Sequence, residues 1–350
     1  MSIFEKVLGI SVVIIVCIAA CIGILIAFKL MINWLSSGNN PLKKYHRNPK
    51  GTTLSQAEQR ALNVGAILAE ANIEFCDSLQ TNKRNAIAIR SLKQTMVEWW
   101  GINSGEDAMK TLEQLKNEGH RQIFNVILSN ASETIVPKPS FEVFRLSYDQ
   151  AGLSIIDEEI SKEYNHEAML VEKHIDVLHA INAEASEKEI DHLIDKYKEL
   201  FDGDETTFSL CIQIYETVLN KYNAYVMYAN NLQQTLEKLR HYGIVDENTA
   251  FDQINPAAWD MGRMVNVARW CYTCGYIEES KAWEYIFLAE KESSSCYTDW
   301  EDFSKAYLIG RALWGGENER LDVTINNVEG LLKDQDSPWH QMPLRVLSVL

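Results

Sequence analysis

The chain has 350 residues, of which 46% are hydrophobic and 23% charged, and its formal net charge is −16 at pH 7. This composition excludes a disordered chain and supplies enough apolar residues for one large folded domain or two modest ones. Residues 51–350 carry 48 Asp and Glu against 27 Lys and Arg. A region this acidic lacks the positively charged surface with which proteins bind nucleic acids. Its charge suits a protein partner with a basic surface.

The N-terminal region contains a long apolar run. Residues 7–28 are 22 positions without a charged side chain, and at about 1.5 Å per residue a helix of this length spans a bilayer core of about 30 Å. Trp34 follows at a position suited to the membrane interface. The sequence therefore predicts a membrane anchor over residues 1–35, with residues 7–28 as the span.

Two other interpretations of this run stay open. A secretory signal peptide usually has a shorter apolar region that ends in small residues. The stretch from Ile18 to Cys21 is also similar to a lipoprotein processing site, which would make Cys21 a lipidated N-terminus. However, the apolar run continues through residues 22–28, where a lipoprotein normally becomes polar. We therefore favour an uncleaved anchor.

The charges that flank the predicted span indicate its orientation. One cation, Lys6, precedes it, and five follow it before residue 51: Lys29, Lys43, Lys44, Arg47 and Lys50. Because basic flanks stay in the cytoplasm, the C-terminal part of the chain is predicted to be cytoplasmic. Residues 36–53 are polar and contain Gly and Pro, so we expect a basic flexible linker that can rest on anionic headgroups.

Residues 54–350 are predicted to form an all-helical domain, because apolar residues recur at helical spacing and no long alternating pattern occurs. A short extended piece is expected at residues 141–146, after Pro137 and Pro139. The helices expected before residue 255 are Leu54–Leu79, Asn85–Trp100, Gly105–Glu118, His120–Ser129, Ile155–Ala180, Ser186–Phe201 and Phe208–Arg240.

The stretch Asn255–Gly316 is predicted to form three aromatic-rich helices. A helix is predicted to start at Asn255 and Pro256, with Asn255 as the capping acceptor at the N-cap and Pro256 at the first helical position. Gly275 is expected to end the first helix. The run Ser293–Ser295 is expected to separate the second helix from the third, and Gly315 to end the third.

Arginines recur within these apolar helices. Arg263 and Arg311 each follow a glycine, and Arg269 lies between Ala268 and Trp270. A buried arginine needs an acidic partner, since an unpaired buried charge costs several kcal/mol, and Asp260 is the first candidate. Two interpretations are open. The arginines form an anion-binding or catalytic pocket, or they form an arginine–carboxylate and arginine–tryptophan network that fixes helix packing.

The seven cysteines are odd in number and have no regular spacing, which suits reduced cytoplasmic thiols better than a disulfide framework. Cys271 and Cys274 form a CxxC pair at a predicted helix end. A redox pair would place its first cysteine at a helix N-terminus, and a zinc site would need two further ligands. We therefore expect structural thiols, with no bound metal or cofactor.

The chain resembles the DUF1266 family of bacterial proteins. The resemblance rests on WDMGRMVNVARW at residues 259–270 and YLIGRALWGG at residues 307–316, with weaker matches at Trp100–Ile102, Gly119–Arg121 and Ser337–Trp339. It covers roughly residues 95–340. The resemblance implies an architecture and adds His120 and Arg121 to the candidate site residues, but it implies no reaction. It also implies that the predicted anchor lies in a bacterial inner membrane.

The sequence thus predicts an all-α protein, with a single N-terminal transmembrane helix followed by a multi-helix globular domain. Two functional hypotheses compete. The first is a membrane-tethered protein-interaction module, of which an immunity-type protein that neutralises a basic toxin is one form. The second is an enzyme that acts on an anionic small molecule. Its candidate site residues are Asp260, Arg263, Arg269, Arg311, His120 and Arg121.

Overall fold

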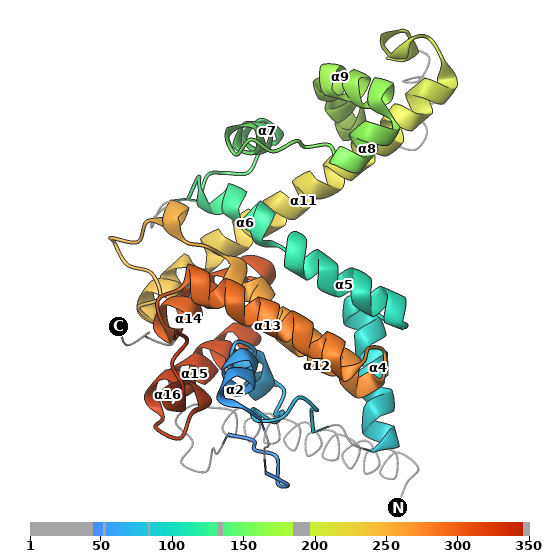
Figure 1. The fold of residues 1–350 in the computed structure, drawn as a ribbon. Coiled ribbons are helices and arrows are strands. Elements are labelled where there is room, and N and C mark those ends of the chain that lie inside the picture. Colours follow the sequence, from blue (N-terminus) through green and yellow to red (C-terminus); the bar gives the residue numbers. More distant parts are fainter. Residues whose placement is uncertain (1–44, 52–53, 83–84, 132–135, 185–196, 346–350) are drawn as a thin grey trace, which may run out of the picture. The chain divides into compact units, whose positions relative to one another are not determined.

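The computed structural model describes residues 45–51, 54–82, 85–131, 136–184 and 197–345. These residues form helices, turns and irregular segments without a β-strand, which confirms the predicted all-α class (Figure 1). The predicted span at residues 7–28 lies outside the described ranges, as does most of the predicted linker. Within those ranges, none of the helices has both the length and the apolar character needed to cross a membrane.

The chain divides into two compact units. The first contains the described residues of Met1–Arg121, Asn255–Arg311 and Glu317–Leu350, and the second those of Gln122–Ile254 and Ala312–Gly316. The helices that lie wholly in the first unit are α2 (Gln56–Asn63), α3 (Ala66–Ala71), α4 (Ala86–Trp100), α5 (Gly105–Asn117), α12 (Ala257–Cys274), α13 (Glu279–Cys296), α15 (Glu319–Lys333) and α16 (Pro338–Gln341). Helix α14 (Trp300–Gly315) begins in this unit.

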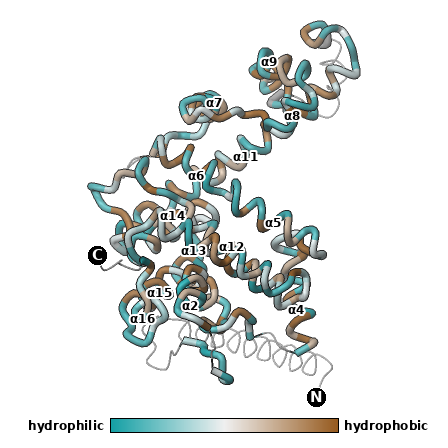
Figure 2. Tube along the Cα trace, viewed as in Figure 1, coloured by the Kyte–Doolittle hydropathy of each residue, from teal (hydrophilic) through white to brown (hydrophobic). Residues whose placement is uncertain are grey.

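Helix α12 forms the core of the first unit. It packs against α3, α4, α5 and α13, and nearly all of its 18 residues are buried. Figure 2 shows hydrophobic residues along α12 and mostly hydrophilic residues along α5. The predicted end of α12 agrees with the structure, whereas its start lies one residue later than predicted, because Pro256 is the N-cap and the helix begins at Ala257. Asn255 accepts a hydrogen bond from the Ala257 amide at 3.0 Å, and Gly275 ends α12 in the left-handed conformation.

Two glycines allow α12 and α14 to approach closely. A Cβ atom on Gly262 would lie 2.7 Å from Cε2 of Tyr307, and one on Gly310 would lie 2.5 Å from Cβ of Trp259. The rings of Trp259 and Tyr307 pack edge to face, with 5.1 Å between their centroids. The glycine that precedes each arginine in the two Gly-Arg pairs is thus required by this helix crossing.

The second unit is built along α11 (Glu205–His241), a helix of 37 residues. It also contains most of α6 (Arg121–Leu128), together with α7 (Phe141–Gln150), α8 (Glu158–Glu163), α9 (Asn165–Glu184) and the 3₁₀ helices η1 (Lys198–Phe201) and η2 (Phe251–Gln253). Aromatic contacts join α7 to α11, since Phe144 lies 5.6 Å from both Tyr222 and Tyr225 between ring centroids. The aromatic residues of α11 therefore form a helix contact.

The extended piece predicted at residues 141–146 is wrong, because these residues begin α7. Ser140 caps the helix by accepting a hydrogen bond from the Val143 amide. Phe141, Phe144 and Tyr148 then recur three and four residues apart and are buried. Their packing outweighs the preference of aromatic residues for strands.

Three other helix predictions are wrong. The helix expected over Ile155–Ala180 is instead α8 and α9, which are separated at Tyr164, and most of the helix expected over Ser186–Phe201 lies outside the described residues. The single helix expected over Leu54–Leu79 is instead α2 and α3, followed by an irregular segment. Gly65 separates them at a point where a Cβ atom would lie 2.6 Å from Val265 of α12. The break expected at Ser293–Ser295 is absent because α13 continues to Cys296. Ser294 and Ser295 donate to carbonyl oxygens three residues earlier, and in this way they stay within the helix.

We predict that Gly310→Ala lowers the free energy of unfolding by about 1–3 kcal/mol. The added methyl group meets the Cβ atom of Trp259, which cannot rotate away, and this overlap outweighs the roughly 1 kcal/mol gained in helix propensity. Urea denaturation of a fragment covering residues 45–350 measures the change. Lys305→Ala, at an exposed position of the same helix, is the control and should change stability by less than about 0.5 kcal/mol. Equal midpoints for the glycine variant and the unmodified fragment would contradict the close approach.

Candidate functional site

The first group of predicted site residues surrounds the carboxylate of Asp260, which is fully buried in the first turn of α12. Its oxygens accept hydrogen bonds from the backbone amides of His120 at 2.9 Å and Arg121 at 3.0 Å, and from the guanidinium of Arg263. We call Asp260, Arg263, His120 and Arg121 the Asp260 cluster. The predicted pairing of Arg263 with Asp260 is therefore present.

Gly119 makes this arrangement possible. Its φ of 56° lies in the left-handed region, and a Cβ atom at this position would overlap the Asp260 carboxylate. The turn between α5 and α6 thus directs two backbone amides at the carboxylate. Asp260 accepts hydrogen bonds from the start of α6 in the way that an N-cap side chain would. The Arg121 side chain turns back to α5, where it donates to the carbonyl oxygens of Leu115 and Lys116.

Arg263 lies between two aromatic rings and the Asp260 carboxylate within the first unit. Its guanidinium carbon lies 4.8 Å from the ring centroid of Trp259 and 5.6 Å from that of Trp100. The Arg263 side chain is only 7% exposed. A charge this deeply buried is stabilised by the carboxylate and the two aromatic faces together. The geometry is that of a packing network.

His120 takes part in the cluster as a neutral imidazole. Its Nδ1 lies 2.8 Å from the Arg263 guanidinium, and because a guanidinium can only donate, Nδ1 is the acceptor. Burial, and then the positive charge of Arg263, lower the pKa of His120 to about 4, although Asp260 acts in the opposite direction. At neutral pH the histidine is therefore uncharged and a weak base.

Arg269 belongs to a second cluster, which holds the irregular segment 72–82 against α12. Its side chain is 2% exposed and donates to the carbonyl oxygens of Phe75 at 2.5 Å and Ser78 at 3.1 Å. Its acidic neighbour is Glu74, at 3.8 Å. The indole nitrogen of Trp270 donates to the same carboxylate at 2.9 Å. Asp260 is the first candidate partner that the sequence offers for the arginines, but the acid beside Arg269 is Glu74.

Arg311 supports the start of α15. Its guanidinium donates to Oδ1 of Asn318 at 2.9 Å, and the same oxygen accepts from the backbone amides of Arg320 and Leu321. Asn318 is thus the N-cap of α15, and Arg311 reinforces it. The structure therefore brings Asp260, Arg263, His120 and Arg121 into one cluster, whereas Arg269 and Arg311 each stabilise a different segment.

The CxxC cysteines are buried thiols at the end of α12. Burial raises the pKa of Cys271 to about 12 and that of Cys274 to about 11, so neither is a thiolate at neutral pH. Both are free, as are Cys76, Cys211 and Cys296. Within the part of the chain that the structure describes, no group of three or more His, Cys, Asp or Glu residues is placed to hold a metal ion.

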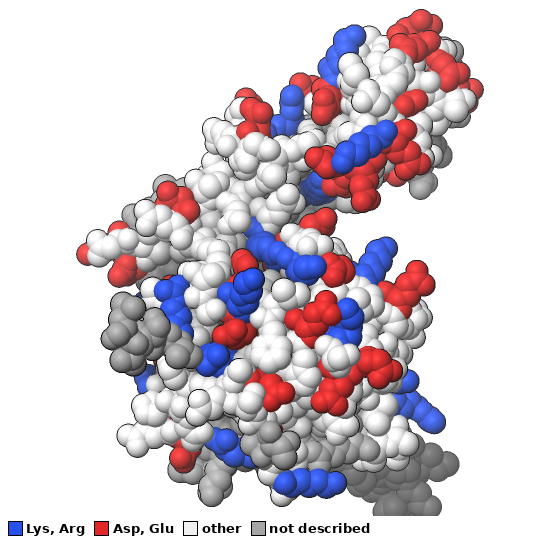
Figure 3. Space-filling view, in the orientation of Figure 1, with Lys and Arg blue, Asp and Glu red and all other residues white. Residues whose placement is uncertain are grey.

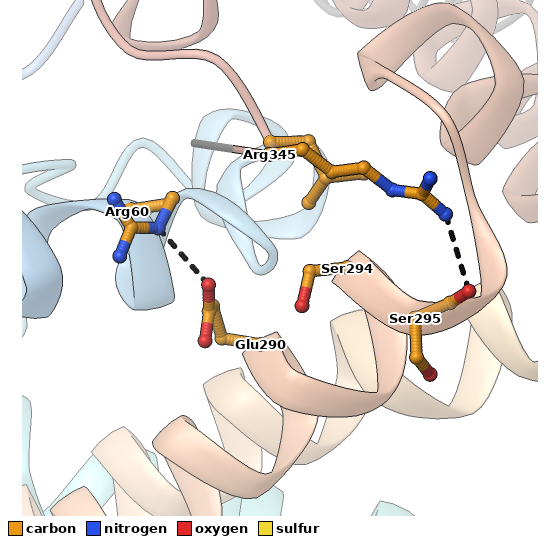
Figure 4. A pocket seen from close by; sticks show the side chains of 6 residues that line it. Arg60, Glu290, Ser294, Ser295 and Arg345 are labelled. Carbon is orange, nitrogen blue, oxygen red and sulfur yellow. Dashed lines mark hydrogen bonds and ion pairs between the residues drawn. The ribbon is translucent and has the colours of Figure 1, made fainter. Parts of the chain in front are cut away.

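A depression of about 490 Å³ in the first unit is lined by Arg60, Glu290, Ser294, Ser295, Leu344 and Arg345 (Figure 4). Its polar side chains are already engaged with their own chain. Arg60 pairs with Glu290 at 2.9 Å, and Arg345 donates to the Ser295 carbonyl at 3.1 Å. None of the six predicted site residues lines this depression. Sequence reasoning did not find it, since its residues come from three distant segments without a motif.

These contacts define an all-helical domain in which the most distinctive residues of the sequence form a buried packing network. The chain belongs to the family described as protein of unknown function (DUF1266), which matches residues 95–344. No curated protein and no solved structure shows a significant match to the chain.

We predict that Arg263→Ala lowers the free energy of unfolding by roughly 3–5 kcal/mol, because it leaves the Asp260 carboxylate buried without its cation. Lys281→Ala, which removes an exposed ion pair with Glu284, should cost less than about 1 kcal/mol. Thermal and urea denaturation of the fragment covering residues 45–350 compare the two variants. An unchanged melting temperature together with a lost cellular phenotype would instead favour a functional arginine pocket.

We also predict that His120 makes the fold less stable in mild acid. Its folded pKa of about 4 lies below the ordinary value of about 6.5. As pH falls from 6.5 towards 4, the unfolded chain binds a proton that the folded chain does not, and stability decreases. Relative to His120→Gln, whose amide oxygen can still accept from Arg263, the unmodified fragment should lose roughly 2 kcal/mol between pH 7.5 and pH 5. Proton NMR of the imidazole checks this, and a titration midpoint at or above 6.5 would contradict it.

Proposed function

We propose that the chain is a membrane-anchored protein-interaction module, and that its second unit binds a partner with a basic surface. The distribution of charge supports this proposal most directly. The ranges of the second unit contain 24 Asp and Glu against 10 Lys and Arg, a net charge of −14, which is most of the excess in a chain of net charge −16. Such a field attracts a basic partner and raises its rate of association.

The acidic side chains of this unit gather on one part of it. Figure 3 shows Asp and Glu concentrated over the region of α8 and α9. We call the following exposed residues of this region the acidic surface: Asp157, Glu158, Glu159, Glu163, Glu172, Asp176, Glu199, Asp202, Asp204 and Glu205. Met169 lies among them in the sequence and is 63% exposed. Acidic and apolar groups together suit a protein surface better than a nucleic acid.

The alternative, an enzyme with an arginine-lined pocket, receives less support. Arg263 and Arg269 are buried and donate to acceptors of their own chain. Arg311 caps a helix through Asn318. His120 is a poor general base at neutral pH, because its pKa is lowered to about 4. A substrate anion would have to displace contacts on which the fold depends.

The membrane anchor and its orientation belong to the same proposal. They rest on the uncharged run at residues 7–28 and on the basic residues that follow it. We place the protein in the inner membrane of a bacterium, in a single pass, with residues 54–350 in the cytoplasm. Neutralisation of a basic toxin by an immunity-type protein is one biological form of this proposal.

Protease treatment tests the orientation. Residues 54–350 should survive in intact spheroplasts and be degraded once the membranes are opened. Digestion in intact spheroplasts would reject the cytoplasmic location and favour the lipoprotein interpretation of Cys21. Mass spectrometry of the N-terminal peptide then separates an intact N-terminus from a lipidated Cys21.

Affinity capture tests the interaction. The full chain, isolated from membranes after crosslinking, should retain a basic protein in stoichiometric amount. The double variant Glu159→Lys with Glu172→Lys should reduce its recovery at least tenfold, since it reverses charge on the acidic surface. The control, Glu106→Lys with Glu278→Lys, makes the same change in net charge at exposed positions of the first unit. Equal recovery with both double variants would contradict a role for the acidic surface. Capture of a phosphorylated metabolite without any protein would instead favour the enzyme hypothesis.

A further inference from the structure

The second unit contains a hollow of about 460 Å³ between α6, the end of α7 and η2. Helix α6 turns one face towards it, because Gln122, Asn125 and Val126 are three and four residues apart. Gln150 contributes from the last residue of α7, and Asp252 from η2. We call this hollow the α6–η2 groove. All of its lining residues belong to the second unit.

Four of the hydrogen-bonding side chains that line the groove are unengaged, whereas the fifth, Ser129, donates to the Val126 carbonyl oxygen. Gln122, Asn125, Gln150 and Asp252 are exposed, and within the described part of the chain none of these four side chains makes a hydrogen bond or an ion pair. The depression at Arg60 and Glu290 differs in this respect, because there the polar groups bind one another. The α6–η2 groove therefore has donors and acceptors available to a ligand, and the other depression has few.

The chemistry of the lining indicates the kind of ligand. Amide side chains carry a donor and an acceptor, so Gln122, Asn125 and Gln150 can match the alternating C=O and N–H groups of a peptide backbone. Leu153 and Ile254 also line the groove and are partly exposed, so they supply apolar surface beside these amides. Asp252 is the single charged residue among those that line the groove, and no lysine or arginine does so.

We propose that the α6–η2 groove binds an extended peptide segment of the basic partner, with a lysine or arginine of that segment paired to Asp252. This inference rests on the proposed function, and it names the part of the second unit that contacts the basic partner. The net charge of the second unit, −14, favours a basic segment over an acidic or neutral one. The amides hold its backbone, and Asp252 sets the position of its cation.

A labelled peptide tests the groove directly. The probe is an octapeptide of alternating alanine and lysine, blocked at both ends and carrying fluorescein, and its anisotropy is measured with the full chain in nonionic detergent. An octapeptide of alternating alanine and glutamate is the matched acidic probe. Asp252→Lys should weaken binding of the basic probe at least tenfold. Glu247→Lys makes the same charge change at an exposed residue outside the groove, and should weaken binding less than threefold.

A neutral variant separates the groove from general charge attraction. Asn125→Ala with Gln150→Ala removes two amides without changing net charge, and should weaken binding at least fivefold. Equal effects of Asp252→Lys and Glu247→Lys, unchanged affinity of the amide variant, or equal binding of the acidic probe would each overturn the proposal.

The same assay distinguishes failure of the groove from failure of the proposed function. If Glu159→Lys with Glu172→Lys abolishes binding and the groove variants do not, the contact lies on the acidic surface, and only the groove is rejected. If the basic probe does not bind the unmodified chain and crosslinking captures no protein, both proposals fall.

Discussion

The first unit depends on one buried carboxylate. Asp260 has no exposed surface, and a carboxylate in such a place costs several kcal/mol unless charge and hydrogen bonds compensate. The amides of His120 and Arg121 and the guanidinium of Arg263 supply this compensation. Each in turn needs a particular neighbour. The amides need Gly119 in its left-handed conformation, and the guanidinium needs the faces of Trp259 and Trp100.

A second constraint is the backbone of the irregular segment 72–82. A segment without regular structure leaves carbonyl oxygens that must find donors when they are buried. Arg269 provides several donors on one planar group and engages the carbonyls of Phe75, Ser78 and Leu79. A lysine could not reach all three in this geometry. Arg269 thus supplies the hydrogen bonds that regular secondary structure would otherwise give this segment, which explains why an arginine occurs at this position of the apolar helix α12.

Helices and contacts within one segment could be predicted from the sequence, whereas contacts between distant segments could not. The all-α fold class and most helices around Asn255–Gly316 could be predicted from apolar periodicity and helix caps. The pair Asp260–Arg263 could be predicted because the two residues are three positions apart on one helix. Glu74 lies 195 residues before Arg269, and nothing in its own neighbourhood marks it as a partner. The extended piece predicted at residues 141–146 is instead the start of α7, because a short aromatic run does not distinguish a strand from a helix until its packing on α11 is known. The α6–η2 groove joins three segments and has no sequence signature.

Several residues of the motifs that resemble the family are also residues on which the scaffold depends. Trp259, Gly262, Arg263 and Gly310 each have a packing or charge-balancing role that the structure accounts for, so the family match at residues 95–344 carries an architecture and leaves the activity open. Candidate residues for partner binding are therefore those side chains that do not stabilise the fold. Exposed acids of α8 and α9 such as Glu159 and Glu172, and the unengaged amides of the α6–η2 groove, meet this condition. Both lie in the second unit, which also carries most of the excess negative charge, and for this reason we propose that the partner binds to that unit.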